Sequence, residues 1–464
     1  MTTTALVLAA GKGTRMRATL AKVLHPLAGR PMLSWVLAAV QQTGATPVVV
    51  VGHQRDQVCA ALPAGVATAV QDPQEGTGHA VQVAADELPR EGVLLVVCGD
   101  TPLLRGETLK ALLDGHGDGL CTVLTASIPA ADAPTSGYGR VVRDQEGTPQ
   151  RIVEAANATA QERAIAEINT GVYAFDAAWL LDQVVPNLVR HPPKGERYLT
   201  DAVEAAARAG GLQAVHHHDL TETMGVNDRA ALAVAEAALR ARINHAWMLA
   251  GVTLQDPATT YVDADAVLAQ DVTLGPGVVL AGRTRLESGV TVGAYAVLTD
   301  TTVGPNSRIL AGTHCEAAVV GPGCRVGPVA RLREGTVLEA GVRIGNFVET
   351  KKARLRAKAT AGHLSYLGDC DVGEDVNIGA GTITCNYDGF AKHRTVIGDR
   401  AFIGSNSALV APVTVGDDTI VGAGSVITQP VPDQTLAVGR GRQKNLVGRA
   451  AEVRARLKRE ADEG

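Results

Sequence analysis

A glycine-rich loop near the N-terminus has residues suited to holding an anion. The segment 8–16 reads Leu-Ala-Ala-Gly-Lys-Gly-Thr-Arg-Met and follows the apolar run 5–8. Glycines allow backbone N–H groups to approach an anion closely, and Arg15 and Lys22 would add positive charge against phosphates. Met16 stands where a dinucleotide-binding fingerprint has its third glycine, and no Gly-Lys-Ser/Thr follows. A tight turn between a strand and a helix therefore explains this spacing as well as a phosphate site does.

A histidine in the second half of the chain is a candidate general base. His363 lies within two polar segments, 346–353 and 361–369, that interrupt an otherwise aliphatic sequence. Acetylation of an amine requires a base for the proton lost on attack, and the ordinary pKa of histidine suits that role. Acyl transfer also needs donors aimed at the developing oxyanion. The alternative is a lone histidine on an exposed turn.

Two other polar clusters have structural explanations. His216, His217 and His218 fall on an expected strand, where consecutive side chains point to opposite faces and do not converge on a metal. Asp201, followed by Glu204, resembles a capping box. We therefore expect Asp201 to start a helix.

Composition argues against several other classes of protein. Of 464 residues, 43 are Lys or Arg and 48 are Asp or Glu, so the net charge is −5, which does not suit a protein that coats nucleic acid. Seven scattered cysteines without a Cys-x-x-Cys pair argue against a disulfide framework or a zinc site. No apolar run reaches the ~18 residues that span a bilayer, and no signal peptide is recognisable. We expect a cytoplasmic protein without membrane insertion.

The first half has the pattern of an α/β domain. Continuous Val and Leu runs alternate with helical segments such as 34–40, for which Ser34 is the expected N-cap. The expected strands are residues 5–8, 47–52 and 93–97. Such runs are typical of a Rossmann-like, mostly parallel sheet, in which ligands bind at the carboxyl ends of the strands. The glycine-rich loop and Asp100 each follow a strand, so this edge is the expected site.

The second half is repetitive. An aliphatic residue followed by glycine recurs at spacings of 6 or multiples of 6, as at 320–321 and 326–327. This hexapeptide pattern predicts a parallel β-helix, in which each aliphatic residue points inward and stacks on its equivalent in the next coil. Three hexapeptides close one coil of about 18 residues, so the segment 251–437 would hold about ten coils.

One step breaks the phase of the repeat. The spacing from Ile378 to Ile397 is not a multiple of 6, and the segment 384–390 lies between them. An insertion in a solenoid maps to a loop on one face, which is often the working face.

Further motifs accompany the glycine-rich loop and Lys22, and together they resemble the signature of sugar-nucleotide pyrophosphorylases. In chain order these motifs are Gln71, Gly76-Thr77-Gly78-His79-Ala80, Gly99-Asp100, Gly137-Tyr138-Gly139-Arg140, Glu154, Ile168-Asn169-Thr170-Gly171, Tyr198-Leu199-Thr200-Asp201 and Gly225-Val226-Asn227. With a hexapeptide β-helix behind them, the whole chain resembles the family of bifunctional N-acetylglucosamine-1-phosphate uridyltransferases and glucosamine-1-phosphate acetyltransferases. Cys98 departs from that pattern, because the family often has tyrosine before Gly-Asp. We expect a ring contact near the nucleotide to be lost there, and we do not expect Cys98 to be a nucleophile.

The resemblance implies three parts of the chain. Residues 1–228 would form the uridyltransferase domain, and 229–250 would form a connecting helix, since 229–249 contain neither Gly nor Pro. Residues 251–464 would form a left-handed β-helix with acetyltransferase activity and a C-terminal tail.

The resemblance also implies the contacts of the N-terminal site. The expected substrate contacts are Leu8, Ala9, Ala10, Gly11, Lys22, Gln71, Gly76, Thr77, Gly139, Glu154, Asn169 and Asn227. Arg15 and Lys22 would act in catalysis by offsetting charge on the triphosphate, and Asp100 and Asn227 would hold Mg²⁺, an ion that prefers oxygen ligands. The sugar 1-phosphate would attack the α-phosphorus of UTP in line, which needs positioning and charge neutralisation more than a protein nucleophile.

The C-terminal site is implied in the same way. His363 would be the catalytic base. The expected contacts of glucosamine 1-phosphate are Arg333, Lys351, Tyr366 and Asn377, and those of acetyl-CoA are Ala380, Asn386, Tyr387, Ser405, Ala423 and Arg440. Left-handed β-helix acyltransferases form trimers with acyl-CoA between subunits, so analogy predicts a homotrimer.

The expected function is therefore synthesis of UDP-N-acetylglucosamine, a precursor of peptidoglycan and lipopolysaccharide. One alternative is a single-function sugar-1-phosphate nucleotidyltransferase whose β-helix serves assembly and regulation. The cluster around His363 and Tyr366 argues against it, because a helix used for assembly does not need these residues. A second alternative is a non-enzymatic scaffold, which explains neither Asp100 nor Asn227.

Overall fold

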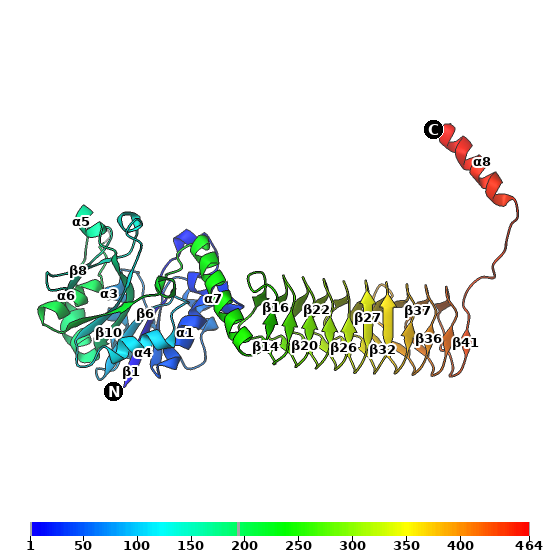
Figure 1. Ribbon diagram of the computed structural model, residues 1–464, viewed down its shortest axis with the longest axis horizontal. Coiled ribbons are helices and arrows are strands. Elements are labelled where there is room, and N and C mark those ends of the chain that lie inside the picture. The colour runs from blue at the N-terminus through cyan, green and yellow to red at the C-terminus, as the bar shows by residue number, and fades with distance from the viewer. Residues whose placement is uncertain (1, 193–194, 464) are drawn as a thin grey trace. The chain divides into compact units, whose positions relative to one another are not determined.

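The computed structural model describes residues 2–192 and 195–463. The chain divides into two compact units (Figure 1). The first comprises Met1–His245 with Val262–Ala264, and the second comprises Ala246–Tyr261 with Asp265–Gly464.

The first unit is built on a mixed sheet with the strand order β11-β7-β10-β6-β1-β4-β5. The strands are β1 Thr3–Leu8, β4 Thr46–Val51, β5 Ala67–Val70, β6 Val93–Cys98, β7 Cys121–Ser127, β10 Glu167–Asp176 and β11 Leu212–His217. β10 runs antiparallel to β6 and β7, whereas β1 is parallel to both β4 and β6. A hairpin of β8 (Arg140–Arg143) and β9 (Pro149–Val153) attaches to β10, and a small hairpin pairs β2 (Pro26–Leu27) with β3 (Arg30–Pro31). The predicted α/β architecture is confirmed.

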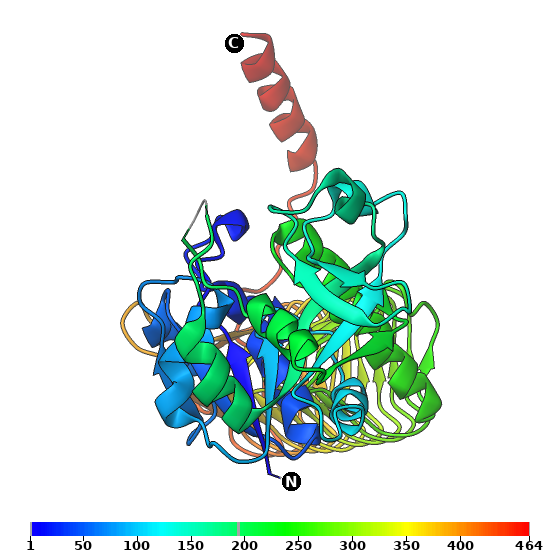
Figure 2. The same cartoon turned by 90° about the vertical axis from the view of Figure 1, so that its left-hand side faces the viewer.

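Helices pack against both faces of this sheet (Figure 2). The α-helices of this part of the chain are α1 Met32–Gln42, α2 Arg55–Ala61, α3 Thr77–Ala84, α4 Gly106–Asp114, α5 Ala160–Arg163, α6 Thr200–Arg208 and α7 Arg229–Leu249. Buried residues of α3 and α6 join one core cluster, and those of α1 and α4 join the other. α7 is the long helix that the sequence predicts over 229–249.

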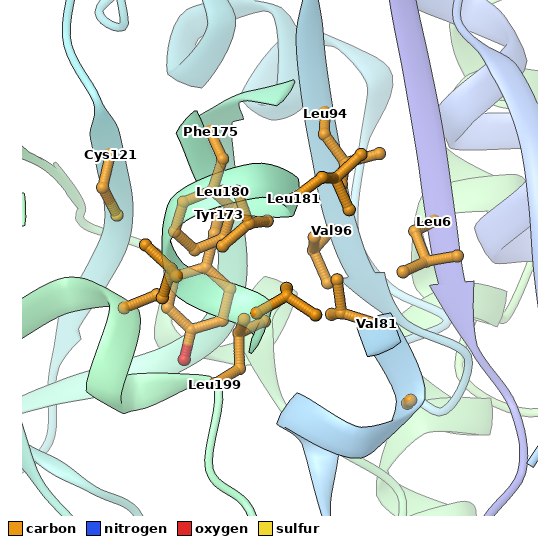
Figure 3. Close-up of a cluster of buried hydrophobic side chains, with 14 of the residues drawn as sticks. Leu6, Val81, Leu94, Val96, Cys121, Tyr173, Phe175, Leu180, Leu181 and Leu199 are labelled. Carbon is orange, nitrogen blue, oxygen red and sulfur yellow. The ribbon is translucent and has the colours of Figure 1, made fainter. Parts of the chain in front are cut away.

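β1 illustrates why the strands are continuously apolar. Successive side chains of a strand point to opposite faces, so Leu6 enters one cluster while Ala5 and Val7 enter the other. Figure 3 shows the cluster of Leu6, in which the rings of Tyr173 and Phe175 are stacked with centroids 5.5 Å apart. A sheet buried on both faces leaves its strand ends as the surface at which polar chemistry can gather.

Two predicted helix starts are wrong. Ser34 lies inside α1, which begins at Met32 with Pro31 as its N-cap and without a side-chain cap. Proline has the fixed φ that suits a helix start, and burial of Met32 extends the helix beyond the predicted cap. Asp201 lies in the first turn of α6, whose N-cap is Leu199, and its Oδ2 lies 2.8 Å from Nε2 of His191. Asp201 therefore fixes a neighbouring loop instead of capping the helix.

The histidine run lies at the end of β11. His216 contacts Thr125 and His217 contacts Glu222, each at 3.2 Å. Among the described residues, no group of three His, Cys, Asp or Glu side chains is arranged to hold a metal.

The second unit is a β-helix whose strands form parallel faces (Figure 1). We call them the first, second and third face. The first face contains β12 Thr253–Leu254, β15 Thr273–Leu274, β18 Thr291–Val292, β21 Arg308–Ile309, β24 Arg325–Val326, β27 Arg343–Asn346, β30 Thr360–His363, β33 Asn377–Ile378, β36 Phe402–Ile403, β39 Ile420–Val421 and β41 Leu436–Ala437.

The other two faces contain the remaining strands of the coils. The second face contains β13 Tyr261–Val262, β16 Val279–Ala281, β19 Val297–Thr299, β22 His314–Glu316, β25 Arg331–Leu332, β28 Glu349–Lys351, β31 Tyr366–Gly368, β34 Ile383–Cys385, β37 Ala408–Val410 and β40 Val426–Ile427. The third face contains β14 Val267–Leu268, β17 Arg285–Leu286, β20 Thr302–Val303, β23 Val319–Val320, β26 Val337–Leu338, β29 Arg354–Leu355, β32 Cys370–Val372, β35 Thr395–Ile397 and β38 Val413–Val415.

The aliphatic residues of the repeat stack inward as predicted. On the first face, Val292, Ile309, Val326 and Ile344 are paired in register from coil to coil, and all are buried. Their strand neighbours, such as Arg308, point outward and are exposed. Each coil is therefore positioned by its pairing with the coil before it. The predicted hexapeptide β-helix is confirmed.

The phase break produces a loop. On β32, Asp371 pairs with Arg354 of the previous coil, and its neighbour Cys370 pairs with Thr395 of the next coil across a longer stretch of sequence. The extra residues, 386–394, lie between β34 and β35. Helix α8 (Arg449–Asp462) ends the chain and is exposed along its length. Among the described residues, no helix is both long and apolar enough to cross a membrane.

The inward stack should dominate the stability of the second unit. Ile309→Ala removes a side chain that is 1% exposed, and we expect it to lower the free energy of unfolding by about 2–5 kcal/mol. Arg308→Ala, on the same strand but outward, should change it by less than about 0.5 kcal/mol. Urea unfolding of both variants checks this expectation, and equal effects would contradict the inward assignment.

Candidate active sites

A cavity of about 590 Å³ lies at the carboxyl ends of β1 and β6 in the first unit. Its walls bring together segments that are far apart in the sequence. The predicted site residues that line it are Leu8, Ala9, Ala10, Gly11, Lys22, Gln71, Gly76, Thr77, Asp100 and Glu154. The volume is in the range of pockets that bind small molecules and cofactors.

The glycine-rich loop brings Lys22 into this cavity. Gly13 has φ +57°, and a Cβ placed on it would lie 2.7 Å from Cβ of Lys22. Glycine therefore meets two demands, a left-handed backbone and a close approach by the lysine stem. The loop can fold back on Lys22, whose ammonium group then reaches the end of β6.

The cationic groups of the site converge on two acceptor oxygens, one from Asp100 and one from Asn227. The ammonium group of Lys22 is paired with Oδ2 of Asp100 and lies 3.3 Å from Oδ1 of Asn227. Nη2 of Arg15 donates to the same Asn227 oxygen at 2.9 Å. The backbone N–H of Val226 donates to the carbonyl of Asp100 at 2.8 Å, which ties the loop before α7 to the end of β6. One cation can thus contact both the carboxylate and the amide oxygen.

The remaining predicted residues lie on the β8–β9 side. The backbone N–H of Asn169 donates to the carbonyl of Gly139 at 2.9 Å, and its Nδ2 donates to the hydroxyl of Tyr173 at 2.7 Å. Glu154 accepts a bond of 3.3 Å from Oγ1 of Thr200, and burial raises the pKa of its carboxyl group. Glu154 lines the cavity. Four other predicted residues do not belong to its lining: Arg15, Gly139, Asn169 and Asn227.

Gln71 and Cys98 both line the cavity, and Cys98 is the less buried of the two. Gln71 is buried, and its Nε2 donates to the carbonyl of Gly76 at 2.8 Å, so its amide has one orientation. Burial beside Asp100 raises the pKa of Cys98 to about 12. Its sulfur therefore remains a thiol near neutral pH, which agrees with the expectation that Cys98 is not a nucleophile.

Sequence reasoning missed some of the lining. Gln74, Glu196 and Tyr198 contribute to the cavity. Gln74 lies between two motif residues, Gln71 and Gly76, and Tyr198 begins the motif 198–201. Their positions in or beside these motifs could have indicated both residues. Glu196 had no such signal, because its role depends on a loop that returns to the sheet edge.

In the second unit, five predicted residues lie along one edge of the β-helix. We call this edge the corner column, and it consists of His363, Ala380, Ser405, Ala423 and Arg440, each at or just after the end of a strand of the first face. Backbone bonds beside these residues join successive corners, from Gly381 to Leu364, Asn406 to Ala380, and Gly424 to Ser405, at 2.7–2.9 Å. Nη1 of Arg440 donates to the carbonyl of Ala423 at 2.7 Å.

The corner column has the dimensions of a long, narrow ligand. Parallel strands are about 4.8 Å apart, so the four steps from His363 to Arg440 span roughly 19 Å. The intervening side chains are small, and the terminal one is cationic. The members of this line are far apart in the sequence. The register of the coils aligns the first four of them, and Arg440 directly follows the next register position, Gly439.

Three predicted sugar-phosphate residues lie together on the second face. Nη1 of Arg333 is 3.0 Å from Oε1 of Glu349, and Nζ of Lys351 is 3.0 Å from Oε1 of Glu334. Tyr366 pairs in register with Glu349. Glu349 belongs to the polar segment 346–353 that the sequence singled out, but its contact with the arginine of the group was not predicted.

Asn377 lies elsewhere. It occupies β33 on the first face, between Thr360 and Phe402 in register. A single chain therefore places Asn377 and Tyr366 on different faces, with His363 at the corner between them. The imidazole Nδ1 of His363 lies 3.2 Å from Oδ1 of Asn346.

The inserted loop places the last two predicted residues. Asn386 is buried, and its Nδ2 donates to Oδ2 of Asp369 at 2.5 Å. Tyr387 is 61% exposed. Asp388 accepts from the N–H groups of the loop, and these bonds hold the pKa of Asp388 below its usual range. The loop thus holds one buried amide, that of Asn386, and two exposed aromatic rings, those of Tyr387 and Phe390.

Comparison with known proteins matches both units. Residues 5–223 match the MobA-like NTP transferase domain family, and residues 394–429 match the bacterial transferase hexapeptide family, with six repeats. The bifunctional protein GlmU of Trichlorobacter lovleyi is 49% identical over 96% of this chain and 97% of its own length. The bifunctional protein GlmU of Pelobacter propionicus is 47% identical over the same shares, and that of Sorangium cellulosum is 46% identical over 98% and 97%.

The chain belongs to the GlmU family. The resemblance drawn from the motifs is therefore confirmed. Family membership covers both units, so the cavity of the first unit and the corner column of the second lie in the two regions that GlmU proteins share with this chain.

The pKa of Cys98 in this GlmU family member predicts a contrast in thiol reactivity. At pH 8 a thiol with a pKa of about 12 is thiolate in only about one molecule in ten thousand. Iodoacetamide should therefore modify the exposed Cys59 and leave Cys98 unmodified. Peptide mass spectrometry at increasing times measures both sites. Equal rates at the two cysteines would contradict the raised pKa of Cys98.

Proposed function

We infer that this chain makes UDP-N-acetylglucosamine in two steps, one in each unit. The second unit transfers an acetyl group from acetyl-CoA to glucosamine 1-phosphate. The first unit joins the resulting N-acetylglucosamine 1-phosphate to UTP and releases pyrophosphate. The observation that carries this conclusion is membership of a bifunctional family across nearly the whole chain, with a candidate site in each unit.

In the acetyl step, the amine nitrogen attacks the thioester carbonyl carbon. The C–N bond forms, the C–S bond breaks, and CoA leaves with the electron pair on sulfur. Nε2 of His363 takes the proton from the amine, a role that a neutral imidazole can perform near pH 7. Arg333 and Lys351 hold the sugar phosphate, because guanidinium and ammonium groups both favour that anion.

The corner column supports the placement of acetyl-CoA. Its pantetheine arm would run along Ala380, Ser405 and Ala423, whose small side chains leave room beside the coils. Arg440 at the far end would contact a CoA phosphate. Asn386 and Tyr387 would border the thioester end from the inserted loop, one coil beyond His363.

In the uridyl step, a phosphate oxygen of the sugar attacks the α-phosphorus of UTP. The bond from the α-phosphorus to the bridging oxygen breaks, and pyrophosphate leaves. Lys22 and Arg15 offset the negative charge by which the two phosphates repel each other, and the backbone of 8–11 holds the nucleotide. Glu154 and Asn169, with Gly139, contact the amino sugar.

Asp100 and Asn227 suit a magnesium ion. Their oxygens already share one cationic partner, Lys22, so they are close enough to share an ion. Mg²⁺ prefers such oxygen donors and completes its shell with water and substrate phosphates. When bound, the ion supplies charge neutralisation to the phosphates.

A homotrimer would complete the acetyl site. Phe402, Ile420 and Leu436 form an outward apolar ladder on the first face, each about half or more exposed. Contiguous exposed apolar groups of this kind are typical of protein interfaces. A neighbouring copy that covers this ladder could bring its second face toward Asn377, which lies on the same face one coil before Phe402.

Reciprocal variants test the assignment of the two steps. His363→Ala should lower CoA release by about 100-fold or more, since it removes the general base, while pyrophosphate release from UTP and N-acetylglucosamine 1-phosphate stays normal. Asp100→Ala should have the opposite pattern. Each variant is the folding control for the other. Normal CoA release by His363→Ala would reject the assigned base and favour the single-function nucleotidyltransferase with a structural β-helix.

Removal of divalent metal should separate the steps again. With EDTA in excess, we expect pyrophosphate release to stop and CoA release to continue, because Asp100 and Asn227 serve the phosphate chemistry alone. Re-addition of Mg²⁺ is the control for reversibility. Unchanged pyrophosphate release in EDTA would contradict the metal assignment.

A further inference from the structure

The ring of His363 is held by a residue to which the proposed function gives no role. Its Nδ1 lies 3.2 Å from Oδ1 of Asn346. Among the described residues, this is the hydrogen bond that the structure gives for the imidazole ring. The two residues are paired in register at the ends of β27 and β30, so they occupy the same corner in successive coils.

The backbone around His363 is fixed by other bonds. The N–H of Leu364 donates to the carbonyl of Asn346 at 3.1 Å, and Oγ of Ser365 donates to the carbonyl of His363 at 2.8 Å. These bonds place the corner whatever side chain residue 346 carries. The amide of Asn346 can therefore act on the orientation of the ring.

We propose that Asn346 is a positioning residue for the base of acetyl transfer, an inference that rests on the proposed function of His363. Oδ1 of Asn346 accepts from Nδ1–H of His363. This bond selects the tautomer whose lone pair is on Nε2, and it stops the ring from rotating about its Cβ–Cγ bond. The lone pair of Nε2 then points away from the corner and toward the amine of the substrate. Which nitrogen carries the proton is set by the partner of the other nitrogen.

The fold itself does not require asparagine at this position. The register of the first face places Ala294, Ala311 and Pro328 at the equivalent corners of the three preceding coils. Alanine is thus compatible with the corner backbone twice in the same β-helix. In chain order from Ala294, Asn346 is the first residue at this corner with a side-chain amide. It lies in the coil directly before that of His363.

Alanine at position 346 provides the test. For Asn346→Ala we expect kcat for CoA release to fall by about tenfold to a hundredfold, the range known for loss of the partner that orients a metal-ligating histidine. KM for acetyl-CoA and for glucosamine 1-phosphate should change little, since the proposed function assigns neither substrate a contact with Asn346. Asn346→Asp retains an acceptor oxygen and should restore most of the lost kcat. Ala311→Asn places the same amide two coils earlier and should leave CoA release unchanged.

A spectroscopic readout separates positioning from a merely structural effect. With ¹⁵N-labelled histidine, the ring nitrogens of His363 should report the Nδ1–H tautomer in the parent protein and a shift toward Nε2–H in Asn346→Ala. Pyrophosphate release by the first unit confirms that the variant is folded. Unchanged kcat in Asn346→Ala, or a loss confined to KM, would overturn the inference and leave the proposed function intact. Absence of CoA release in the parent protein would overturn both.

Discussion

The parallel register of neighbouring strands is the constraint on which both sites depend. In the second unit, each coil is bonded to the coil before it and stacks the same aliphatic position inward, as Ile309, Val326 and Ile344 do. Once that stack is fixed, every other position of the repeat is also fixed in space. Corner residues that are a full coil apart in the sequence become direct neighbours. The corner column from His363 to Arg440 results from this register, without any additional loop to assemble it.

The same constraint acts on the first unit in a different form. β1 and β6 are parallel and adjacent, so the loop after Leu8 and the carboxylate of Asp100 end at one edge. Phosphate chemistry needs charge at such an edge, and Lys22 and Arg15 supply it. Acetyl transfer needs a neutral base and a slender channel instead. These demands conflict within one cavity, which gives a physical reason for placing the two reactions in separate units.

Much of this arrangement could be predicted from the sequence because it depends on periodicity. Val and Leu runs predicted the buried sheet, and hexapeptide spacing predicted the inward stack. The exact residues at which helices begin were harder to predict. Ser34 looks like a cap, but burial of Met32 begins α1 earlier, and Asp201 binds His191 from a loop that sequence spacing does not place near it. The partners of Glu349 and Asn346 were not predicted, although both lie in the polar segment 346–353, and Glu196 was missed altogether. Such contacts are set by the register or by returning loops. The position of Asn377 away from Tyr366 also depends on which face each strand joins, and a motif does not encode that.

The central claim is that two chemically different steps run in sequence on one chain. The most direct test is a time course of the parent protein with glucosamine 1-phosphate, acetyl-CoA, UTP and Mg²⁺, in which free CoA and pyrophosphate are followed separately. The account predicts that both products appear, that CoA release leads, and that omission of acetyl-CoA abolishes pyrophosphate release. Pyrophosphate release from glucosamine 1-phosphate without release of CoA would contradict it.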